Sequence, residues 1–309
     1  MTQAGQHIAV IGAGLMGHGI ALTFARAGHR VSVTDPVADM LATCPARIGE
    51  SLTLLGAGAV DVADALGRVT LAKDMASAVS GADVVFEAAP EKLELKQKIF
   101  ADIEAHAPAD AILASNTSVI QISKIMGGLS GRHRAMGTHW WNPPHMIPLV
   151  EVVKTEWTDH ALAQRMFDLL AHAGKTPAMV EKDVPGFIGN RLQHALWREA
   201  ISLVENGICD AETVDDVVKA SFGRRLAVLG PLENADLVGL ELTQDIHKQV
   251  LFDLEISGDP SPYLQKMRDS GRSGMAAGAG LRDWKPGDLE KTKARVADHL
   301  RKLDDILPN

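Results

Sequence analysis

The chain of 309 residues has very little cysteine and no long apolar run. Its two cysteines, Cys44 and Cys209, are too few for a disulfide framework and lack the spacing of a metal site, so we expect ordinary thiols and no bound metal. No uninterrupted apolar stretch reaches the roughly 20 residues of a membrane-spanning helix. A strand-like run follows His7 directly, with no signal-peptide pattern before it. These absences predict a reduced, cytoplasmic protein.

Basic residues are also scarce. The 31 Lys and Arg residues are outnumbered by 39 Asp and Glu residues, so the net charge is −8 and the isoelectric point is near 5.8. This balance disfavours nucleic acid and anionic membranes as partners. Lysine is absent from residues 35–72, where Arg47 and Arg68 are the basic side chains. The hydrophobic fraction of 46% is enough for a sizeable core, and the length favours two domains.

The N-terminal residues follow the order strand, glycine motif, helix, strand, acid. The apolar run 8–11 is typical of a strand buried on both faces, and residues 31–34 form a second strand that ends at Asp35. Between the two lies a G-x-G-x-x-G motif made of Gly12, Ala13, Gly14, Leu15, Met16 and Gly17. In this context the motif predicts a Rossmann fold that binds a dinucleotide.

Each part of this unit has a physical task in dinucleotide binding. Gly12 permits a tight turn, Gly14 lets a pyrophosphate approach the backbone, and Gly17 lets helix and strand pack closely. The start of the helix offers N–H groups to the phosphates. Asp35 is placed to accept hydrogen bonds from a ribose and would repel a 2′-phosphate, so we expect NAD rather than NADP. A Rossmann-like fold without a cofactor is the alternative.

Three further polar segments are expected at the ends of buried strands. Pro90-Glu91 follows the run 82–89, and Ser115–Ser118 follow the run 111–114. His139 ends a third extended segment. Because ligands of open α/β sheets bind beyond the carboxyl ends of the strands, we expect these segments to meet at one edge. Scattered polar residues are the alternative.

His139 and Glu151 flank the turn signal Asn142-Pro143-Pro144. We expect two extended segments joined by a turn-rich loop, with His139 ending the first and Glu151 inside the second. A histidine backed by a buried carboxylate is a general base whose tautomer is fixed and whose cationic form is stabilised. A purely structural pair, or two unrelated residues, is the alternative.

The β pattern ends near residue 181. Residues 182–186 combine charge, proline and glycine, which marks a boundary. We therefore expect an α/β fold in two parts, a Rossmann NAD-binding domain over residues 1–185 and an all-α domain over residues 186–309. Apolar spacing predicts one long helix from Phe187 and shorter helices up to residue 250, and residues 36–70 are also predicted to be helical, with interruptions. Residues 281–300 are predicted to form a charged helix with Trp284 as an anchor at its start.

Taken in order, these motifs resemble the 3-hydroxyacyl-CoA dehydrogenase family. The resemblance covers nearly all of the chain to about residue 245, and it rests on residues 12–17, 90–91, 115–118, 139–143, 149–152 and 185–191. It implies an N-terminal Rossmann domain and a helical C-terminal domain that forms a homodimer. It also implies NAD-linked oxidation of a 3-hydroxy group to a 3-keto group.

The resemblance also implies roles for single residues. His139 matches the general base and Glu151 its orienting partner. Residues that hydrogen-bond the substrate oxygen are matched by Ser118 and Asn190. The nicotinamide half of the cofactor site is matched by Glu91, Lys96 and Asn142. The guanidinium group of arginine pairs well with carboxylates. The candidates to bind a substrate carboxylate are therefore Arg191, Arg198, Arg224 and Arg225.

Three of these residues have plainer alternatives. Ser118 is also a good helix N-cap. Asn190 could be a buried polar residue satisfied within its own helix, and Lys96 could be a solvated helix charge.

The chain departs from the family pattern on the CoA side. Members that act on CoA thioesters have a lysine-rich helical segment after the second strand that faces the CoA phosphates, whereas Gly58 stands here where a lysine is expected. In the C-terminal part, Ala276 stands where the family has a lysine. Phosphates without cationic partners bind poorly. The stretches from His139 to Glu151 and from Arg224 to Glu233 resemble members acting on free hydroxy acids. Such members include lambda-crystallin (itself similar to L-gulonate 3-dehydrogenase) and the dehydrogenases of carnitine and of a vitamin B6 breakdown product. We therefore expect a small hydroxy acid as substrate; a true L-3-hydroxyacyl-CoA dehydrogenase and a non-catalytic NAD-binding protein are the alternatives.

Overall fold

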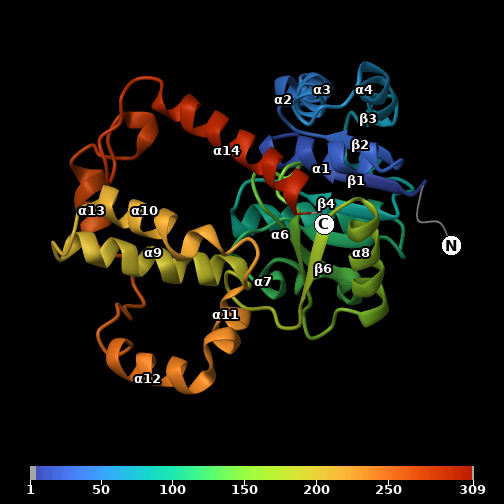
Figure 1. Cartoon of the computed structure of the whole chain (residues 1–309). Helices are drawn as coiled ribbons and strands as arrows, with labels where there is room; N and C mark the ends of the chain where they lie inside the picture. The colour runs from blue at the N-terminus through green and yellow to red at the C-terminus, as the bar shows by residue number, and fades with distance from the viewer. Residues whose placement is uncertain (1–4, 308–309) are drawn as a thin grey trace. The chain divides into compact units, whose positions relative to one another are not determined.

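The structure, a computed structural model, describes residues 5–307 apart from the side chains of residues 304 and 305. One eight-stranded sheet, in the order β3-β2-β1-β4-β5-β6-β7-β8, organises the N-terminal part (Figure 1). Its strands are β1 (His7–Ile11), β2 (Arg30–Thr34), β3 (Val69–Leu71), β4 (Val84–Glu87), β5 (Ile112–Ser115), β6 (Ala135–Trp140), β7 (Leu149–Val153) and β8 (Thr176–Val180).

The first six strands are parallel, and the direction changes at β7. Strand β7 pairs antiparallel with β6, and β8 runs parallel to β7. The chain moves outward from β1 to β2 and β3 and then returns to β4 on the other side of β1. Strands β1 and β4 therefore flank the point where the strand order reverses, which is where open α/β sheets bind their ligands. At that point Ile11 lies beside Glu87.

Helices cover both faces of this sheet. They are α1 (Leu15–Arg26), α2 (Ala38–Ala42), α3 (Cys44–Leu54), α4 (Ala59–Leu66), α5 (Met75–Val79), α6 (Leu93–His106), α7 (Ile122–Met126), η1 (Arg132–Arg134) and α8 (His160–His172). Alternate residues of one strand point to opposite faces, so Val10 packs in one core with α1, α3 and α8, and Ala9 in another with α5, α6 and α7. Two apolar layers therefore hold the sheet rigid beneath its carboxyl edge.

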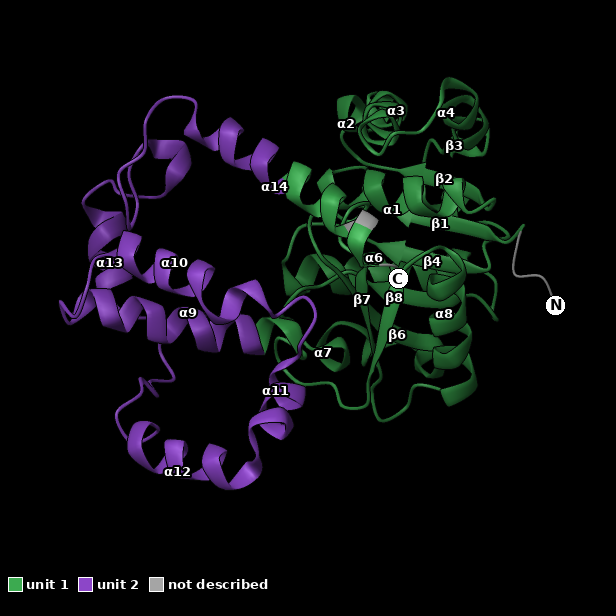
Figure 2. Ribbon diagram, viewed as in Figure 1, with its two compact units in different colours: residues 1–191, 297–309 green, residues 192–296 purple. Residues whose placement is uncertain are grey.

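The remaining elements are helical. They are α9 (Gly189–Glu205), α10 (Ala211–Ala220), η2 (Phe222–Arg224), α11 (Pro231–Val238), α12 (Leu240–Val250), α13 (Pro262–Asp269), η3 (Met275–Ala277) and α14 (Asp288–Ile306). The chain divides into two compact units, unit 1 with residues 1–191 and 297–309 and unit 2 with residues 192–296 (Figure 2). The expected boundary at residue 185 falls inside the first segment of unit 1.

The expected fold class, a Rossmann domain followed by helices, is confirmed. Two local expectations are wrong. Residues 69–71 form an edge strand rather than the end of a helix, because three residues are too few to carry a strand pattern. Helix α14 begins at Asp288 rather than near residue 281, since Pro286 and Gly287 (φ 86°) interrupt the helical pattern just before it. Trp284 thus precedes the helix, with the Arg282 guanidinium 5.1 Å from its ring centre.

Within residues 5–307 we find no helix whose length and apolar composition would suffice for a bilayer crossing.

Candidate active site

His139 and Glu151 are direct partners in the pairing of β6 with β7. Cross-strand partners in an antiparallel pair point to the same face, so the two side chains meet above the sheet. His139 Nδ1 lies 2.6 Å from Glu151 Oε2, and both side chains are buried. The carboxylate can only accept a hydrogen bond, so the proton of the neutral ring sits on Nδ1. The acceptor lone pair of the ring is therefore on Nε2, to which no described residue forms a hydrogen bond.

The rest of the Glu151 carboxylate is also satisfied. Its Oε1 accepts hydrogen bonds from the backbone N–H groups of Ile188 at 2.8 Å and Gly189 at 3.1 Å. Burial by itself would raise the pKa of Glu151, but the hydrogen bonds from His139 and from the two amides together outweigh it and place the pKa below its ordinary value. Glu151 is therefore an ionised carboxylate at neutral pH.

The residue after these two amides, Asn190, reaches back to the loop beyond β5. Its Nδ2 donates to the Ser118 carbonyl at 2.8 Å, and Asn190 is buried. The bond joins residues 72 positions apart, so the alternative that Asn190 is satisfied within its own helix is wrong. Ser118 is not a helix N-cap either, because α7 begins at Ile122 with Gln121 as its N-cap.

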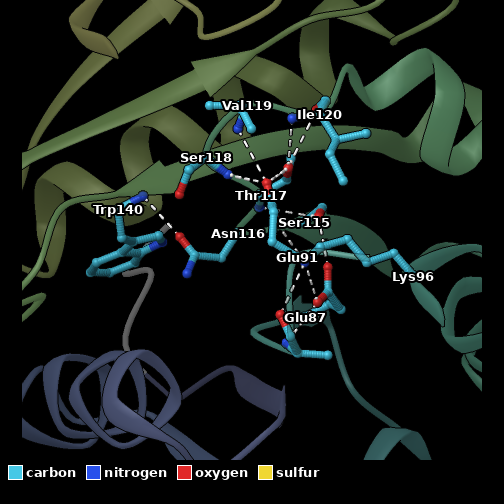
Figure 3. A network of polar contacts seen from close by, with 11 residues as sticks. Glu87, Glu91, Lys96, Ser115, Asn116, Thr117, Ser118, Val119, Ile120 and Trp140 are labelled. Carbon is cyan, nitrogen blue, oxygen red and sulfur yellow. Dashed lines mark hydrogen bonds and ion pairs between the residues drawn. The ribbon is translucent and has the colours of Figure 1, made fainter. Parts of the chain in front are cut away.

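A polar network joins the ends of β4 and β5 to helix α6 (Figure 3). Lys96 Nζ lies 2.7 Å from Glu87 Oε1 and 3.4 Å from Glu91 Oε2. Ser115 Oγ donates to Glu87 Oε2 at 2.6 Å. Lys96 is fully buried, so the alternative of a solvated helix charge is wrong. Glu87 was not singled out by the sequence analysis, although an acid inside the apolar run 84–89 is a signal that could have identified it.

Glu91 connects this network to the polar loop. Its Oε1 accepts hydrogen bonds from the Thr117 hydroxyl, from Ser118 N at 2.9 Å and from Val119 N at 3.2 Å (Figure 3). Partial burial would raise the pKa of Glu91, but the Thr117 hydroxyl, the Lys96 charge and the two amides together lower it. Ser118 is therefore held at its N–H by Glu91 and at its carbonyl by Asn190.

The glycine motif shows where the backbone is crowded and where it is open. A Cβ on Gly17 would stand 1.7 Å from the Gly12 carbonyl oxygen, so this residue must be glycine for α1 and the loop to pack. Gly12 has φ of 103°, which other residues rarely adopt. A Cβ on Gly14 would meet nothing within 4 Å. Gly14 is also the N-cap of α1, where no side chain caps the helix and the first turn holds no acid.

The loop fits the pyrophosphate of a dinucleotide, because the open space above Gly14 meets an uncapped helix N-terminus with its positive potential. Asp35 fixes the loop from the end of β2. Its Oδ2 accepts from Ala13 N at 2.7 Å and its Oδ1 from Val37 N at 2.8 Å. A carboxylate has about four acceptor positions, so Asp35 keeps acceptor capacity for a ribose hydroxyl.

The other predicted site residues belong to different parts of the chain. Asn142 is exposed in the loop between β6 and β7. Arg191 is exposed at the end of the first segment of unit 1. The three remaining arginines, Arg198, Arg224 and Arg225, belong to unit 2, where Arg198 donates to the Ser257 carbonyl at 3.2 Å. Among the residues that the structure describes, no group of three or more His, Cys, Asp or Glu side chains is placed to hold a metal ion.

A Rossmann sheet with this glycine loop, and with a histidine beside a carboxylate at the same edge, is the architecture of a nicotinamide-dependent dehydrogenase. The chain belongs to the 3-hydroxyacyl-CoA dehydrogenase family: residues 7–184 match the model of its NAD binding domain and residues 186–284 that of its C-terminal domain. It is therefore an NAD-dependent oxidoreductase of this family, whose members act on CH–OH groups.

Relatives of two kinds match almost the whole chain. It is 36% identical over 299 residues to 5-formyl-3-hydroxy-2-methylpyridine 4-carboxylate 5-dehydrogenase of Mesorhizobium japonicum, covering 96% of each chain. It is also 36% identical to the human mitochondrial hydroxyacyl-coenzyme A dehydrogenase, covering 91% of each. A crystal structure of a 5-formyl-3-hydroxy-2-methylpyridine 4-carboxylic acid 5-dehydrogenase, described as an NAD+ dependent dismutase, superposes with a TM-score of 0.90 at 34% identity, covering 98% of both chains.

The glycine loop gives a matched pair of substitutions. Gly14→Ala should leave the folded protein nearly as stable, with Tm lowered by no more than about 3 °C, because no protein atom lies near the new methyl group. The methyl group would stand where phosphates approach, so the Kd for NAD should rise at least about tenfold. Gly17→Ala should instead destabilise the fold by about 3 kcal/mol, because its methyl group meets a backbone oxygen.

Scanning calorimetry and calorimetric titration with NAD measure the two effects. A Gly14→Ala protein that binds NAD as tightly as the wild type would show that the phosphates do not approach this loop.

Proposed function

We propose that the protein oxidises the 3-hydroxy group of a small hydroxy acid that is not bound to CoA, with His139 as general base and Glu151 as its orienting partner. The observation that carries the proposal is the 2.6 Å hydrogen bond between His139 Nδ1 and Glu151 Oε2, both buried at the carboxyl edge of the sheet. In this proposal residues 1–185 hold NAD and residues 186–309 serve substrate binding and dimerisation.

A secondary alcohol is a very weak acid, so its oxidation is helped by simultaneous removal of the hydroxyl proton. Bound NAD supplies the hydride acceptor. His139 takes the proton at Nε2, and the resulting imidazolium is stabilised by the ionised Glu151 carboxylate on the other side of the ring. In the reverse direction the imidazolium returns the proton to the carbonyl oxygen.

Two further groups support the substrate oxygen in this proposal. Asn190 uses one N–H for the Ser118 carbonyl, which leaves its second N–H for a ligand. The Ser118 hydroxyl forms no hydrogen bond to a described residue, and Ser118 is exposed. Donors aimed at an oxygen that gains negative charge stabilise the transition state. For the cofactor, we propose Glu91, Lys96 and Asn142 on the nicotinamide side and Asp35 on the adenosine side.

The charge of the segment after β2 favours a free acid over a CoA thioester. Residues 35–68 hold five carboxylates and no lysine. Arg47 donates to the carbonyls of Met40 at 2.6 Å and Gly14 at 3.4 Å, and Arg68 forms an ion pair with Asp64 at 2.7 Å. Arg47 is thus the one basic side chain of residues 35–68 that has no acidic partner, and a single cation does not balance the several phosphate charges of CoA. The pyridine carboxylate dehydrogenase that the chain resembles over 96% of its length is named for a small carboxylate substrate.

Oxidation of a 3-hydroxyacyl-CoA is the second candidate. It is favoured by the 36% identity to the human hydroxyacyl-coenzyme A dehydrogenase, over 91% of both chains. A non-catalytic NAD-binding role is less favoured, because His139, Glu151, Ser118 and Asn190 are all present.

Replacing the base tests the mechanism. His139→Gln should lower kcat by about 10²–10⁴ while the Kd for NAD stays within about threefold, because the proton acceptor is lost and the glycine loop is unchanged. Stopped-flow NADH absorbance and NAD titration measure both. The control is His133→Gln, an exposed histidine outside the site, which should keep the wild-type rate. Near-full activity of His139→Gln would mean that the base is another residue.

Substrate choice is tested by comparing kcat/KM for free acids and CoA thioesters. The panel pairs free 3-hydroxybutyrate with 3-hydroxybutyryl-CoA, and it adds L-gulonate, L-carnitine and 5-formyl-3-hydroxy-2-methylpyridine 4-carboxylate. We expect the best free acid to exceed the CoA thioester by at least about tenfold, since uncompensated phosphates bind weakly. A preference for the thioester would support the second candidate, and no turnover with any compound despite NAD binding would support the non-catalytic role.

We also propose that unit 2 pairs with unit 2 of a second copy of this chain. Of residues 192–296, all of which the structure describes, only Gly280 is buried. Large apolar side chains on several helices and loops are exposed, including Trp197 at 50%, Leu232 at 80% and Phe252 at 80%. Apolar surface of this extent marks an interaction surface, and a homodimer contact is the common way to cover it.

The expected mass in light scattering after size exclusion is therefore twice the chain mass of 33.0 kDa. A charged substitution on α12, Ile246→Asp, combined with Trp197→Asp, should shift the equilibrium toward the monomer, because it places charges in an apolar contact. Val60→Asp is the matched control, since Val60 is equally apolar and 82% exposed but lies in unit 1. A wild-type protein that stays monomeric at about 10 µM contradicts the proposal.

A further inference from the structure

Arg47 is a cation without an acidic partner beside the glycine loop. Its Nη1 donates to the Gly14 carbonyl at 3.4 Å and its Nη2 to the Met40 carbonyl at 2.6 Å. The Asp35 carboxylate at the end of β2 does not pair with it and instead accepts hydrogen bonds from two backbone amides. Two backbone carbonyls are thus the only hydrogen-bond partners of this guanidinium group among the described residues.

The guanidinium group keeps donors for a ligand. Each Nη atom of an arginine carries a second N–H, and no described residue accepts these two hydrogens of Arg47. Its Nε atom is buried and has no hydrogen-bond partner either, while the residue as a whole is half-buried. Donors of a charged group removed from water are costly to leave unpaired, so this pattern indicates that an acceptor binds here.

The place of Arg47 in its helix is electrostatically unfavourable. Helix α3 begins at Cys44, so Arg47 stands at the end of the first turn. The peptide dipoles give this turn a positive potential, which favours acids and disfavours cations. The first turn of α3 holds no acid, and no side chain caps the helix. Helix stability therefore does not explain an arginine at this position, whereas a bound anion would offset both positive charges.

Helix α1 adds a second positive contribution at the same place. Its N-terminus is uncapped, and the space above Gly14, where a Cβ would point, is open. Burial is the main cause that lowers the pKa of His18, and the charge of Arg47 lowers it further, so this charge acts on the first turn of α1. A guanidinium group and an uncapped helix N-terminus therefore meet at an open residue. This combination suits a multiply charged group such as a pyrophosphate.

The plainer alternative is that Arg47 only joins two backbone segments. Met40 belongs to α2 (Ala38–Ala42), and the last carbonyls of a helix need partners from outside it. The bond to Gly14 is long, however, and the Gly14 carbonyl already accepts the His18 backbone N–H at 3.1 Å. A role confined to these carbonyls requires a donor but not a charge, and this difference can be tested.

We propose that Arg47 binds the pyrophosphate of NAD, so that the cofactor is the counter-ion of this guanidinium group. The proposal rests on the glycine loop as the site of the phosphates and does not depend on the substrate. It also implies that the one cation of residues 35–68 without an acidic partner is occupied whenever NAD is bound, and is then not available to the phosphates of a CoA thioester.

The test compares two ligands that differ in their phosphates. ADP-ribose contains the adenosine and the pyrophosphate of NAD, whereas adenosine carries no charge. Arg47→Gln keeps an amide donor and removes the charge. Its Kd for ADP-ribose should rise at least about tenfold, and its Kd for adenosine should change less than about twofold, because only the first ligand presents an anion. Calorimetric titration measures both. An equal rise for the two ligands, or a rise for neither, would overturn the proposal.

Two further variants separate charge from shape. Arg47→Met lacks both donor and charge; it should bind ADP-ribose as weakly as Arg47→Gln, and it replaces that variant if the glutamine protein does not fold. Arg47→Lys keeps the charge without the planar fork, so its Kd for ADP-ribose should stay within about threefold of the wild type. A lysine variant as weak as the glutamine variant would show that the charge does not bind the phosphates, which contradicts the proposal.

Salt gives a readout that a merely structural role would not move. Ion pairs are screened, so raising the salt from about 0.05 M to about 0.5 M should weaken ADP-ribose binding more in the wild type than in Arg47→Gln. The matched control is Arg26→Gln, which removes an exposed arginine from the last turn of the same helix α1 that begins after Gly14. It changes the net charge equally and should keep the wild-type Kd and salt dependence. Equal salt dependence in the wild type and Arg47→Gln would count against the ion pair.

Kinetics distinguish this proposal from the proposed function. Arg47→Gln should raise KM for NAD about tenfold and leave kcat at saturating NAD within about twofold, because the ion pair is the same in the ground state and the transition state. A kcat that falls as far as kcat/KM would contradict a role in cofactor binding. The titrations need no turnover. Weakened ADP-ribose binding in a protein that turns over none of the substrates would therefore uphold the role of Arg47 and contradict the proposed function.

Discussion

The pairing of β6 with β7 is the constraint on which the site depends. Strand β7 runs against β6, so the middle of β7 lies beside the carboxyl end of β6, where His139 stands. Direct partners across an antiparallel pair project from the same face, and this lets the imidazole and the carboxylate meet. A slip of one residue would turn Glu151 to the opposite face and leave His139 without its partner. The apolar residues of β7 on both sides of Glu151 oppose such a slip, because Val150 and Val152 are buried in the core beneath.

From Glu151 the constraint passes to the neighbouring segments. The two amides that satisfy its second oxygen fix the start of α9, and the next residue, Asn190, binds the Ser118 carbonyl. On the other side of the loop, the Asn116 side chain accepts from Trp140 N at 3.0 Å, next to His139 (Figure 3). The loop after β5 is therefore joined both to β6 and to the start of α9. Side chains from four separate segments share one set of hydrogen bonds, which restricts each of them more than a single contact would.

The sequence predicts the framework of this arrangement well and its buried polar links poorly. Strand, glycine loop, helix and acid follow one another within a short stretch, so local pattern suffices for the cofactor loop. The pattern of its helix left open that Lys96 is a solvated charge, because its partner Glu87 lies nine positions away on a strand and only the folding of α6 over the sheet joins them. The bond from Asn190 to the Ser118 backbone spans 72 positions and leaves no pattern in residue type. Sequence motifs do not predict such contacts, because a backbone atom is the same in every residue type.

The two buried carboxylates at this edge differ in how their charge is balanced. Glu87 faces the Lys96 ammonium group, which lies 2.7 Å from its Oε1. Glu151 faces an imidazole, whose charge depends on its proton. The hydrogen bond from His139, together with those from the Gly189 and Ile188 amides, keeps the pKa of Glu151 below its ordinary value despite burial. Uptake of a proton at His139 therefore completes an ion pair with an anion that is already in place, and no other group has to move or ionise. His139 can therefore become positively charged with little rearrangement of the groups around it. Proton transfer from a hydroxyl group is easier when the base is surrounded in this way.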